Sequence, residues 1–214
     1  MAALALDIED ARSTGDSTGA GALERIRSAA NAAMDRYADG DDAAFATLYD
    51  LLAPRLYAFA FRQLRSAAAT EDVIQQAMLQ MHCARESFVS GADVIPWAYA
   101  ITRRLVIDGF RRARHRERLV PEPDYDSDDG PASTDGRPDD ILYSKQLAER
   151  MERALMALPE AQRVAFQLMR FEGLSAVDAA AVLDTTPNAV KLRAHRTDQA
   201  LRLALKEGGV GGRR

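Results

Sequence analysis

The sequence has little of several things that define common classes of protein. Cysteine occurs once, at Cys83, so no disulfide can form within the chain, and we expect a reducing, cytoplasmic location. No stretch approaches the roughly 20 apolar residues of a membrane-spanning helix, and the N-terminus lacks a basic segment followed by an apolar one. We therefore expect neither membrane insertion nor secretion. With 214 residues, 47% hydrophobic and 28% charged, the chain has room for one large or two small domains.

Groups suited to catalysis are also scarce. The three histidines, His82, His115 and His195, are scattered, and no Gly-rich phosphate loop occurs. Adjacent His82 and Cys83 point in different directions from a helix and are too few to hold zinc. We expect no catalytic residue, no metal site and no cofactor, so the sequence does not indicate an enzyme.

Charge is segregated along the chain, although the net charge is only -4. Residues 103–118 contain two acidic residues and seven arginines: Arg103, Arg104, Arg111, Arg112, Arg114, Arg116 and Arg118. Residues 122–140 contain eight acidic residues and one arginine, interspersed with proline and glycine. Such a stretch cannot bury a core, so residues 118–140 are predicted to be an acidic, flexible linker, without regular structure between about Pro121 and Asp140.

The linker divides the sequence into two small helical domains, over residues 22–117 and 141–207, with flexible tails at 1–21 and 208–214. An all-α fold is expected because hydrophobic residues recur at three- and four-residue steps, with almost no strand pattern. The first domain is predicted to contain helices over residues 22–38 and 42–64, a third from Thr70 and a fourth from near Pro96. In the third helix one face is apolar and the other is rich in glutamine: Val73, Ile74, Ala77, Met78 and Met81 against Gln75, Gln76 and Gln80.

The fourth helix combines an apolar side with a basic one. Ala98, Ile101, Leu105 and Gly109 share one face, and the arginines crowd the opposite side. Trp97 and Tyr99 stand at its start, and an aromatic group beside a basic stripe suits unstacked, single-stranded bases. The alternative for Trp97 is a core anchor, which is the commoner role of a tryptophan at a helix start.

The C-terminal quarter has the pattern of a helix-turn-helix. Ser175 is predicted to cap the first helix, and Thr186 the second, with Pro187 at its first position and a tight turn between the two helices. The second helix has an apolar back and a polar, basic front: Val190, Ala194, Thr197, Leu201 and Ala204 against Asn188, Lys191, Leu192, His195, Gln199 and Arg202. This is typical of a helix that reads the DNA major groove, although an ordinary amphipathic helix would show the same two faces.

Two motif blocks in a fixed order carry a resemblance to a known family. EDVIQQAM at 71–78, Phe88 and WAYAITRRLVIDGFRR at 97–112 resemble region 2 of the sigma-70 family. LPEAQR at 158–163, EGLS at 172–175 and the helix-turn-helix resemble region 4. With only these domains and a short linker, the chain is similar to the extracytoplasmic-function (ECF, group IV) sigma factors.

The resemblance implies a function and a set of partners. It implies a bacterial, cytoplasmic RNA polymerase subunit that binds core polymerase, recognises minus-35 and minus-10 promoter elements, and melts the upstream promoter DNA. The chain would then initiate transcription of a stress or envelope regulon, and an anti-sigma factor would hold it inactive. The acidic linker matches the segment that threads the RNA exit path.

The resemblance also implies roles for individual residues. The polymerase-binding positions would be Asp72, Gln75 and Gln76. The positions that meet the minus-10 element would be Trp97, Arg103, Arg104, Arg111 and Arg112. The positions that meet the minus-35 element would be Asn188, Lys191, Leu192, His195 and Arg196. The chain departs from the family pattern at five sites: Gln76 replaces Glu, Met78 a bulkier group, Arg104 an Asn, Asp184 the usual Gly of the turn, and Leu192 a small polar residue. Asp184 is tolerable there because Asp can adopt a left-handed conformation.

Two functions from other classes also fit the sequence. A conventional helix-turn-helix regulator with a helical sensor domain would bind duplex DNA unaided, and a pure interaction module would titrate a regulatory partner. Binding to core polymerase separates the three, because only a sigma factor converts that enzyme into a promoter-specific one.

Overall fold

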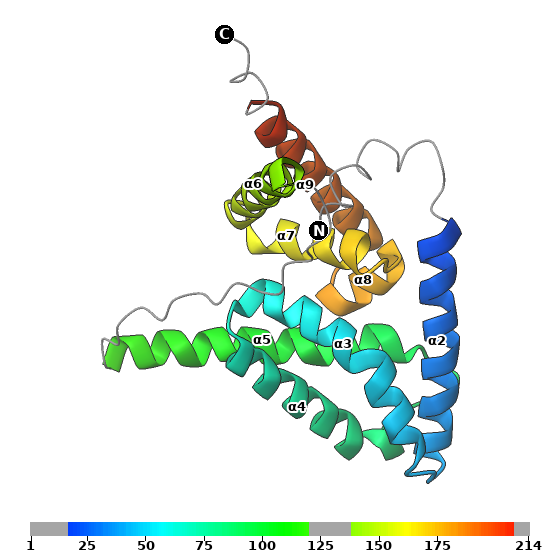
Figure 1. Ribbon diagram of the computed structural model, residues 1–214. Helices are drawn as coiled ribbons and strands as arrows, with labels where there is room; N and C mark the ends of the chain where they lie inside the picture. Colours follow the sequence, from blue (N-terminus) through cyan, green and yellow to red (C-terminus); the bar gives the residue numbers. More distant parts are fainter. Residues whose placement is uncertain (1–16, 120–137, 208–214) are drawn as a thin grey trace. The chain divides into compact units, whose positions relative to one another are not determined.

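The computed structural model describes residues 17–119 and 138–207, and every regular element in these two ranges is a helix (Figure 1). The chain forms two compact units. The first contains α2 to α5, and the second contains α6, α7, η2, the first part of α8, and α9. This confirms the all-α fold of two small helical domains. The predicted tails and most of the predicted linker, residues 1–16, 120–137 and 208–214, lie outside the described residues.

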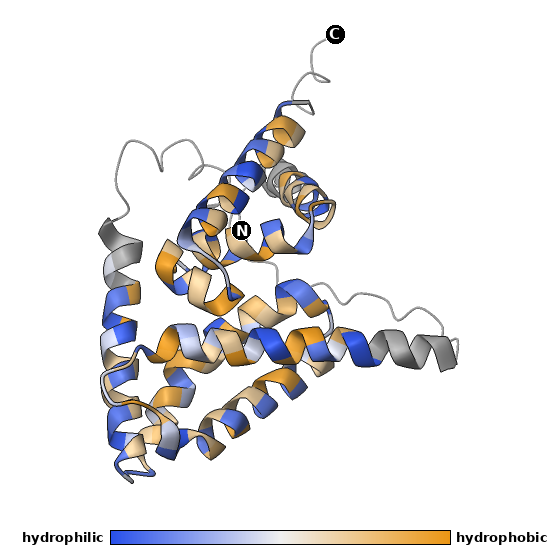
Figure 2. Ribbon diagram, turned by 180° about the vertical axis from the view of Figure 1, so that it is seen from behind, coloured by the Kyte–Doolittle hydropathy of each residue, from blue (hydrophilic) through white to orange (hydrophobic). Residues whose placement is uncertain are grey.

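The first unit is built from four α-helices and a short 3-10 turn. They are α2 (Ser17–Ala38), α3 (Ala44–Leu64), α4 (Ala67–Cys83), η1 (Arg85–Ser87) and α5 (Val94–Leu119). Helices α3, α4 and α5 pack on one another in all three pairs. Figure 2 shows hydrophobic and hydrophilic residues alternating along α5, as expected for a helix with one buried face. Fully buried side chains from three helices meet in this core, among them Leu48, Leu56, Phe59, Met81, Ile95 and Tyr99.

Two helix starts in this unit differ from the prediction by three residues or more, and those of α3 and α5 by two. Helix α2 begins at Ser17 instead of residue 22, inside the predicted tail. Helix α4 begins at Ala67, because the Ser66 hydroxyl accepts a hydrogen bond from the Ala69 amide at 3.3 Å. Thr70, the predicted start, is fully buried inside the helix, where its hydroxyl donates to the Ser66 carbonyl at 2.7 Å. The start of this helix was therefore predicted three residues too late.

The C-terminal end of α2 is tied to α4 and η1 by side chains. The Tyr37 hydroxyl hydrogen-bonds with His82 Nδ1, and the Arg85 guanidinium lies 5.2 Å from the centre of the Tyr37 ring. Arg85 also forms a 2.7 Å ion pair with Asp42. The pKa of Arg85 is raised, first by its hydrogen bond with Tyr37 and then by Asp42. These contacts join the beginning of the chain to the segment that precedes α5.

The second unit contains α6 (Pro138–Met156), α7 (Glu160–Phe166), the π-helical turn η2 (Gln167–Phe171), the first part of α8 (Ala176–Leu183) and α9 (Pro187–Glu207). Helix α9 packs against α6 and α7, and Leu155, Phe166 and Leu201 form a buried cluster between them. The side chain of Arg150 on α6 donates to the Ala204 carbonyl on α9 at 3.1 Å. The long α9 is thereby held along its inner face.

Helix α6 begins inside the segment that we predicted to be without regular structure. Its first residues are Pro138, Asp139 and Asp140. Proline suits the first position of a helix, since that residue needs no amide hydrogen, and acidic residues in the first turn are favoured by the helix dipole. The linker prediction was wrong for these three residues because the same composition also begins a helix.

No helix in residues 17–119 and 138–207 combines the length and the apolar character needed to cross a bilayer.

Candidate nucleic-acid and polymerase interfaces

The helix-turn-helix is fixed by two caps and a left-handed turn. The Ser175 hydroxyl accepts from the Asp178 amide at 3.1 Å, and the Asp178 carboxylate accepts from the Ser175 amide at 3.4 Å. The Thr186 hydroxyl accepts from the Ala189 amide at 3.2 Å. Asp184 has φ +49°, which lies in the left-handed region. Both predicted caps are confirmed, and Asp184 adopts the left-handed conformation that makes it tolerable where the family commonly has Gly.

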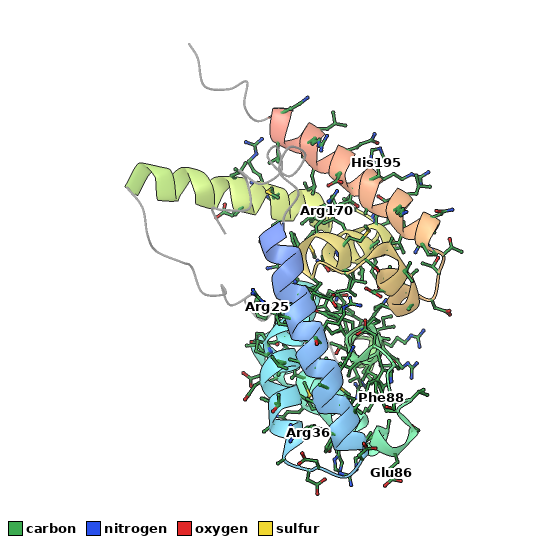
Figure 3. All side chains as sticks on the ribbon, turned by 90° about the vertical axis from the view of Figure 1, so that its right-hand side faces the viewer. Arg25, Arg36, Glu86, Phe88, Arg170 and His195 are labelled. Carbon is green, nitrogen blue, oxygen red and sulfur yellow. The ribbon has the colours of Figure 1, made fainter. Side chains whose placement is uncertain are left out.

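Helix α9 separates its two faces as the sequence predicted. On the inner face Val190, Ala194, Thr197 and Leu201 are buried, and Ala204 is partly buried. All five predicted minus-35 residues are exposed: Asn188, Lys191, Leu192, His195 and Arg196. His195 Nε2 lies 3.1 Å from Gln199 Nε2 one turn later, which couples two polar groups on this outer face (Figure 3). Leu192 is the apolar member of this set and is 49% exposed.

One cation beside α9 was not predicted. Arg170, in η2, is exposed and forms a 2.9 Å ion pair with Asp198 on α9 (Figure 3). The only signal in the sequence was a lone arginine in an apolar stretch, and that did not indicate contact with a residue 28 positions later.

Helix α4 presents the predicted polymerase-binding residues to solvent. Asp72, Gln75 and Gln76 are exposed, whereas the opposite face is buried through Val73, Ile74, Ala77, Met78 and Met81. Beside them lies a pocket of about 520 Å³ between α3 and α4. It is lined by Tyr49, Asp50, Ala53, Pro54, Tyr57, Glu71, Ile74 and Gln75.

Two residues that line this pocket were not predicted from the sequence. Tyr49, at 47% exposed, and Asp50 come from α3, which was interpreted only through its buried residues. With Glu71 and Asp72 they give the α4 surface aromatic and acidic character.

Helix α5 carries the predicted basic front. Arg104, Arg111 and Arg112 are exposed, and Arg103 is partly buried. The Asp108 carboxylate lies 3.7 Å from the Arg111 guanidinium and partly offsets the positive charge of this front. The backbone carbonyl of Asp108 accepts a hydrogen bond from Arg112 Nε at 3.3 Å. The side chains of the later arginines, from Arg114 onward, lie outside the described residues.

The two aromatic residues at the start of α5 have different roles. Tyr99 is buried and contacts Phe59 edge to face, with ring centres 5.3 Å apart, so it belongs to the core. Trp97 is partly buried and lies 5.2 Å from the Phe88 ring. It helps to line an open pocket of about 250 Å³ with Ala84, Ser87, Phe88, Val89, Ala92 and Asp93. Trp97 therefore packs against Phe88 and also forms part of the solvent-accessible wall of this pocket.

No group of three or more side chains with metal-ligand chemistry comes together among the residues whose side chains are described.

These surfaces define a class: a protein, helical over the described residues, with a helix-turn-helix whose second helix has an exposed polar front, and with a separate basic helix flanked by an aromatic pocket. Comparison with known families agrees. Residues 48–116 match sigma-70 region 2, and residues 148–201 match sigma-70 region 4.

Relatives that match about four-fifths of this chain identify the family more closely. An ECF RNA polymerase sigma factor, SigF of Caulobacter vibrioides, is 32% identical over 79% of this chain and 90% of its own length. The RNA polymerase sigma factor CarQ of Myxococcus xanthus is 33% identical over 81% of this chain and 96% of its own length. The chain belongs to the ECF sigma factors of the sigma-70 family.

Solved structures are consistent with this membership. The sigma factor RpoE in its complex with the anti-sigma factor NepR from Bartonella quintana has a TM-score of 0.59 and 25% identity, over 76% of this chain and 96% of that one. CnrH in complex with the cytosolic domain of CnrY shares the fold, with a TM-score of 0.61 and 21% identity over 84% of this chain and 98% of that one. The chain is thus a transcription initiation factor that binds core RNA polymerase and promoter DNA, and not a conventional helix-turn-helix regulator.

Proposed function

We propose that three exposed surfaces divide the work of promoter recognition. In a bacterial cytoplasm, the α4 face around Asp72, Gln75 and Gln76 binds core polymerase, and α9 reads the minus-35 element. The start of α5 binds the melted minus-10 element, and the transcripts belong to a stress or envelope regulon. The observation that carries this proposal is the consistent division of α4 and α9 into a buried apolar back and an exposed polar front. Such fronts contribute nothing to the core, so they are available for partners.

The pocket at Phe88 and Trp97 supports a role in strand melting. A pocket of about 250 Å³ is smaller than those that hold drug-sized ligands, and aromatic walls suit the face of a single base. Arg103 and Arg104 lie further along α5. The guanidinium of each offers hydrogen-bond donors and no acceptor. Within this proposal Arg104 favours an edge rich in acceptors, such as guanine O6 and N7, or the neighbouring phosphate.

Regulation by an anti-sigma factor is part of the proposal. RpoE from Bartonella quintana, whose structure resembles this chain, was solved in complex with the anti-sigma factor NepR. The exposed α4 face and its acidic, aromatic pocket offer a partner charged and apolar anchors. An anti-sigma factor that covers them would block polymerase binding directly.

Run-off transcription tests the proposed function. Purified core polymerase should initiate at discrete sites on genomic fragments only when this chain is added, and the mapped start sites should share upstream minus-35 and minus-10 elements. A chain that binds these fragments alone but does not redirect core polymerase would contradict the proposal.

Removing one cation from α9 should weaken DNA binding without altering its sequence preference. Lys191 is exposed and carries a compact charge, which mostly meets phosphate. We expect Lys191→Ala to reduce affinity for all promoter sequences by a similar factor and to lower the salt slope of binding by about one unit. Leu192→Ala, which changes only an apolar contact, is the matched comparison and should leave the slope unchanged. Titration of holoenzyme binding at several salt concentrations checks both, and a new sequence preference for Lys191→Ala would reverse the assignment.

A further inference from the structure

The segment between η1 and α5, residues 88–93, is held by helix α2 from the beginning of the chain. The Gly91 amide donates to Asp35 Oδ1 at 3.1 Å, and the Val94 amide donates to Asn31 Oδ1 at 2.9 Å. The Arg27 guanidinium forms an ion pair with the Asp93 carboxylate. Figure 3 shows Phe88 and Glu86 beside the end of α2 that carries Arg36. Side chains of α2 thus contact this segment at Gly91 and Asp93 and the first residue of α5, Val94.

The spacing of the three α2 residues explains the contact. Positions 27, 31 and 35 are separated by four residues, so they form a single row along one side of the helix. The row is presented at a fixed height because Ala30, Ala33 and Met34 anchor α2 in the core. The side chains of Arg27, Asn31 and Asp35 therefore fix the position of residues 91–94.

The loop depends on these partners. Its own hydrogen bonds are few: the Ala92 amide bonds to the Val89 carbonyl at 3.0 Å, and the Ile95 amide to Asp93 Oδ1 at 3.1 Å. Gly91 has φ +79°, so the chain reverses there and its amide turns toward Asp35. Without Asn31 and Asp35, two backbone donors would exchange defined partners for solvent, and the loop would no longer occupy one position.

The same loop forms the wall of the pocket beside Trp97. Phe88, Val89, Ala92 and Asp93 line it together with Trp97, and Asp93 immediately precedes α5. A shift of the loop would change the shape of the pocket, because Trp97 lies on α5 while the loop is held by α2. Helix α2 precedes the residues that match sigma-70 region 2, which begin at position 48.

We propose that Asn31 and Asp35, with Arg27, are positioning residues that set the base preference at the minus-10 element by fixing the loop beside Trp97. They need not touch DNA. This inference rests on the proposed role of the pocket in holding an extruded base.

The expected effect is a loss of discrimination rather than a loss of initiation. Loss of one hydrogen bond typically changes an equilibrium constant by about fivefold. We therefore expect Asp35→Ala to reduce the preference for the favoured base at one minus-10 position by about fivefold, and Asn31→Ala to do the same. The minus-35 preference should not change, since α9 lies in the other unit.

The experiment uses full-length variants with core polymerase and a promoter library randomised over the minus-10 element behind a constant minus-35 element. Asp35→Asn retains the Oδ1 acceptor and should restore the wild-type preference. Ser28→Ala, an exposed change on the same helix, should behave as wild type. Hydrogen exchange measured by NMR should show the Gly91 amide exchanging faster in Asp35→Ala, but not in Asp35→Asn.

Each outcome separates the positioning role from simple stability. Lower activity on every sequence, or a lower melting temperature, with an unchanged base preference in Asp35→Ala would overturn the inference. A preference that Asp35→Asn fails to restore would also overturn it, because the acceptor would then not be the cause.

Trp97→Ala distinguishes failure of the inference from failure of the proposed function. If Trp97→Ala leaves the minus-10 preference intact, the pocket does not read DNA and both ideas fall. If Trp97→Ala changes the preference and Asp35→Ala does not, the pocket reads the base but α2 does not tune it.

Discussion

Asp72→Arg should abolish promoter-specific transcription by this chain while leaving its fold intact. Asp72 is exposed on α4, next to Gln75, Gln76 and the acidic, aromatic pocket, so the substitution replaces an acceptor with five donors and reverses the charge. In an interface, loss of one member of a hydrogen-bonded charge pair costs about 2–5 kcal/mol, which is roughly 30-fold to several-thousand-fold in affinity. In the free chain, a surface change of this kind usually alters stability by no more than about 0.5 kcal/mol.

Asp39→Arg provides the matched control. Asp39 is an exposed acid in the same unit, and the change in net charge is identical. Titration of labelled core polymerase with each variant, followed by run-off transcription, should show near-normal binding for Asp39→Arg and little or none for Asp72→Arg. Equal weakening of both variants would mean that net charge, and not this face of α4, governs docking.

Phe59→Ala should destabilise the first unit by about 3–5 kcal/mol. The Phe59 side chain is 0% exposed and lies edge to face with Tyr99, which links α3 to α5. A domain is stable by only about 5–15 kcal/mol in total, so this loss removes a large part of the free energy of unfolding. Promoter melting should fall with it, because α5 carries the basic front.

The sequence provides its own reporter for this measurement. Trp97 is the only tryptophan and lies in the first unit, so its fluorescence in urea follows the unfolding of that unit. Circular dichroism follows both units, and the transition of the second should not move. Phe110→Ala is the matched control, since Phe110 is 42% exposed and its removal should change stability little. Similar losses for the two phenylalanines would contradict the assigned core.

Local patterns were sufficient for much of this molecule. The two faces of α4 and α9, the caps at Ser175 and Thr186 and the left-handed Asp184 all follow from short-range rules, because a helix places residues three and four apart on one side and a cap reaches only two or three residues. The helix starts were less accurate. At the beginning of α4, both Ser66 and Thr70 had suitable side chains, and burial of Thr70 decided between them.

The environments of the two aromatic residues of α5 could not be predicted from local sequence rules. Trp97 and Tyr99 were two neighbouring candidates for the same basic stripe, yet Tyr99 packs on Phe59, forty positions earlier, whereas Trp97 meets Phe88 and a pocket. Their sequence context is nearly identical. The direction of each ring follows from which helices surround α5, and that is a property of the assembled unit.

The sequence by itself determined the all-helical class, the division into two units, the family and the polar fronts of α4, α5 and α9, because each depends on composition or on the period of a single helix. Only the tertiary structure decided that α2 grips residues 91–94 through Arg27, Asn31 and Asp35, that Arg170 meets Asp198, and that Tyr49 and Asp50 border the α4 surface. These contacts join residues on different elements, and no periodicity encodes which side chain of one helix will lie opposite a given backbone amide of a distant loop.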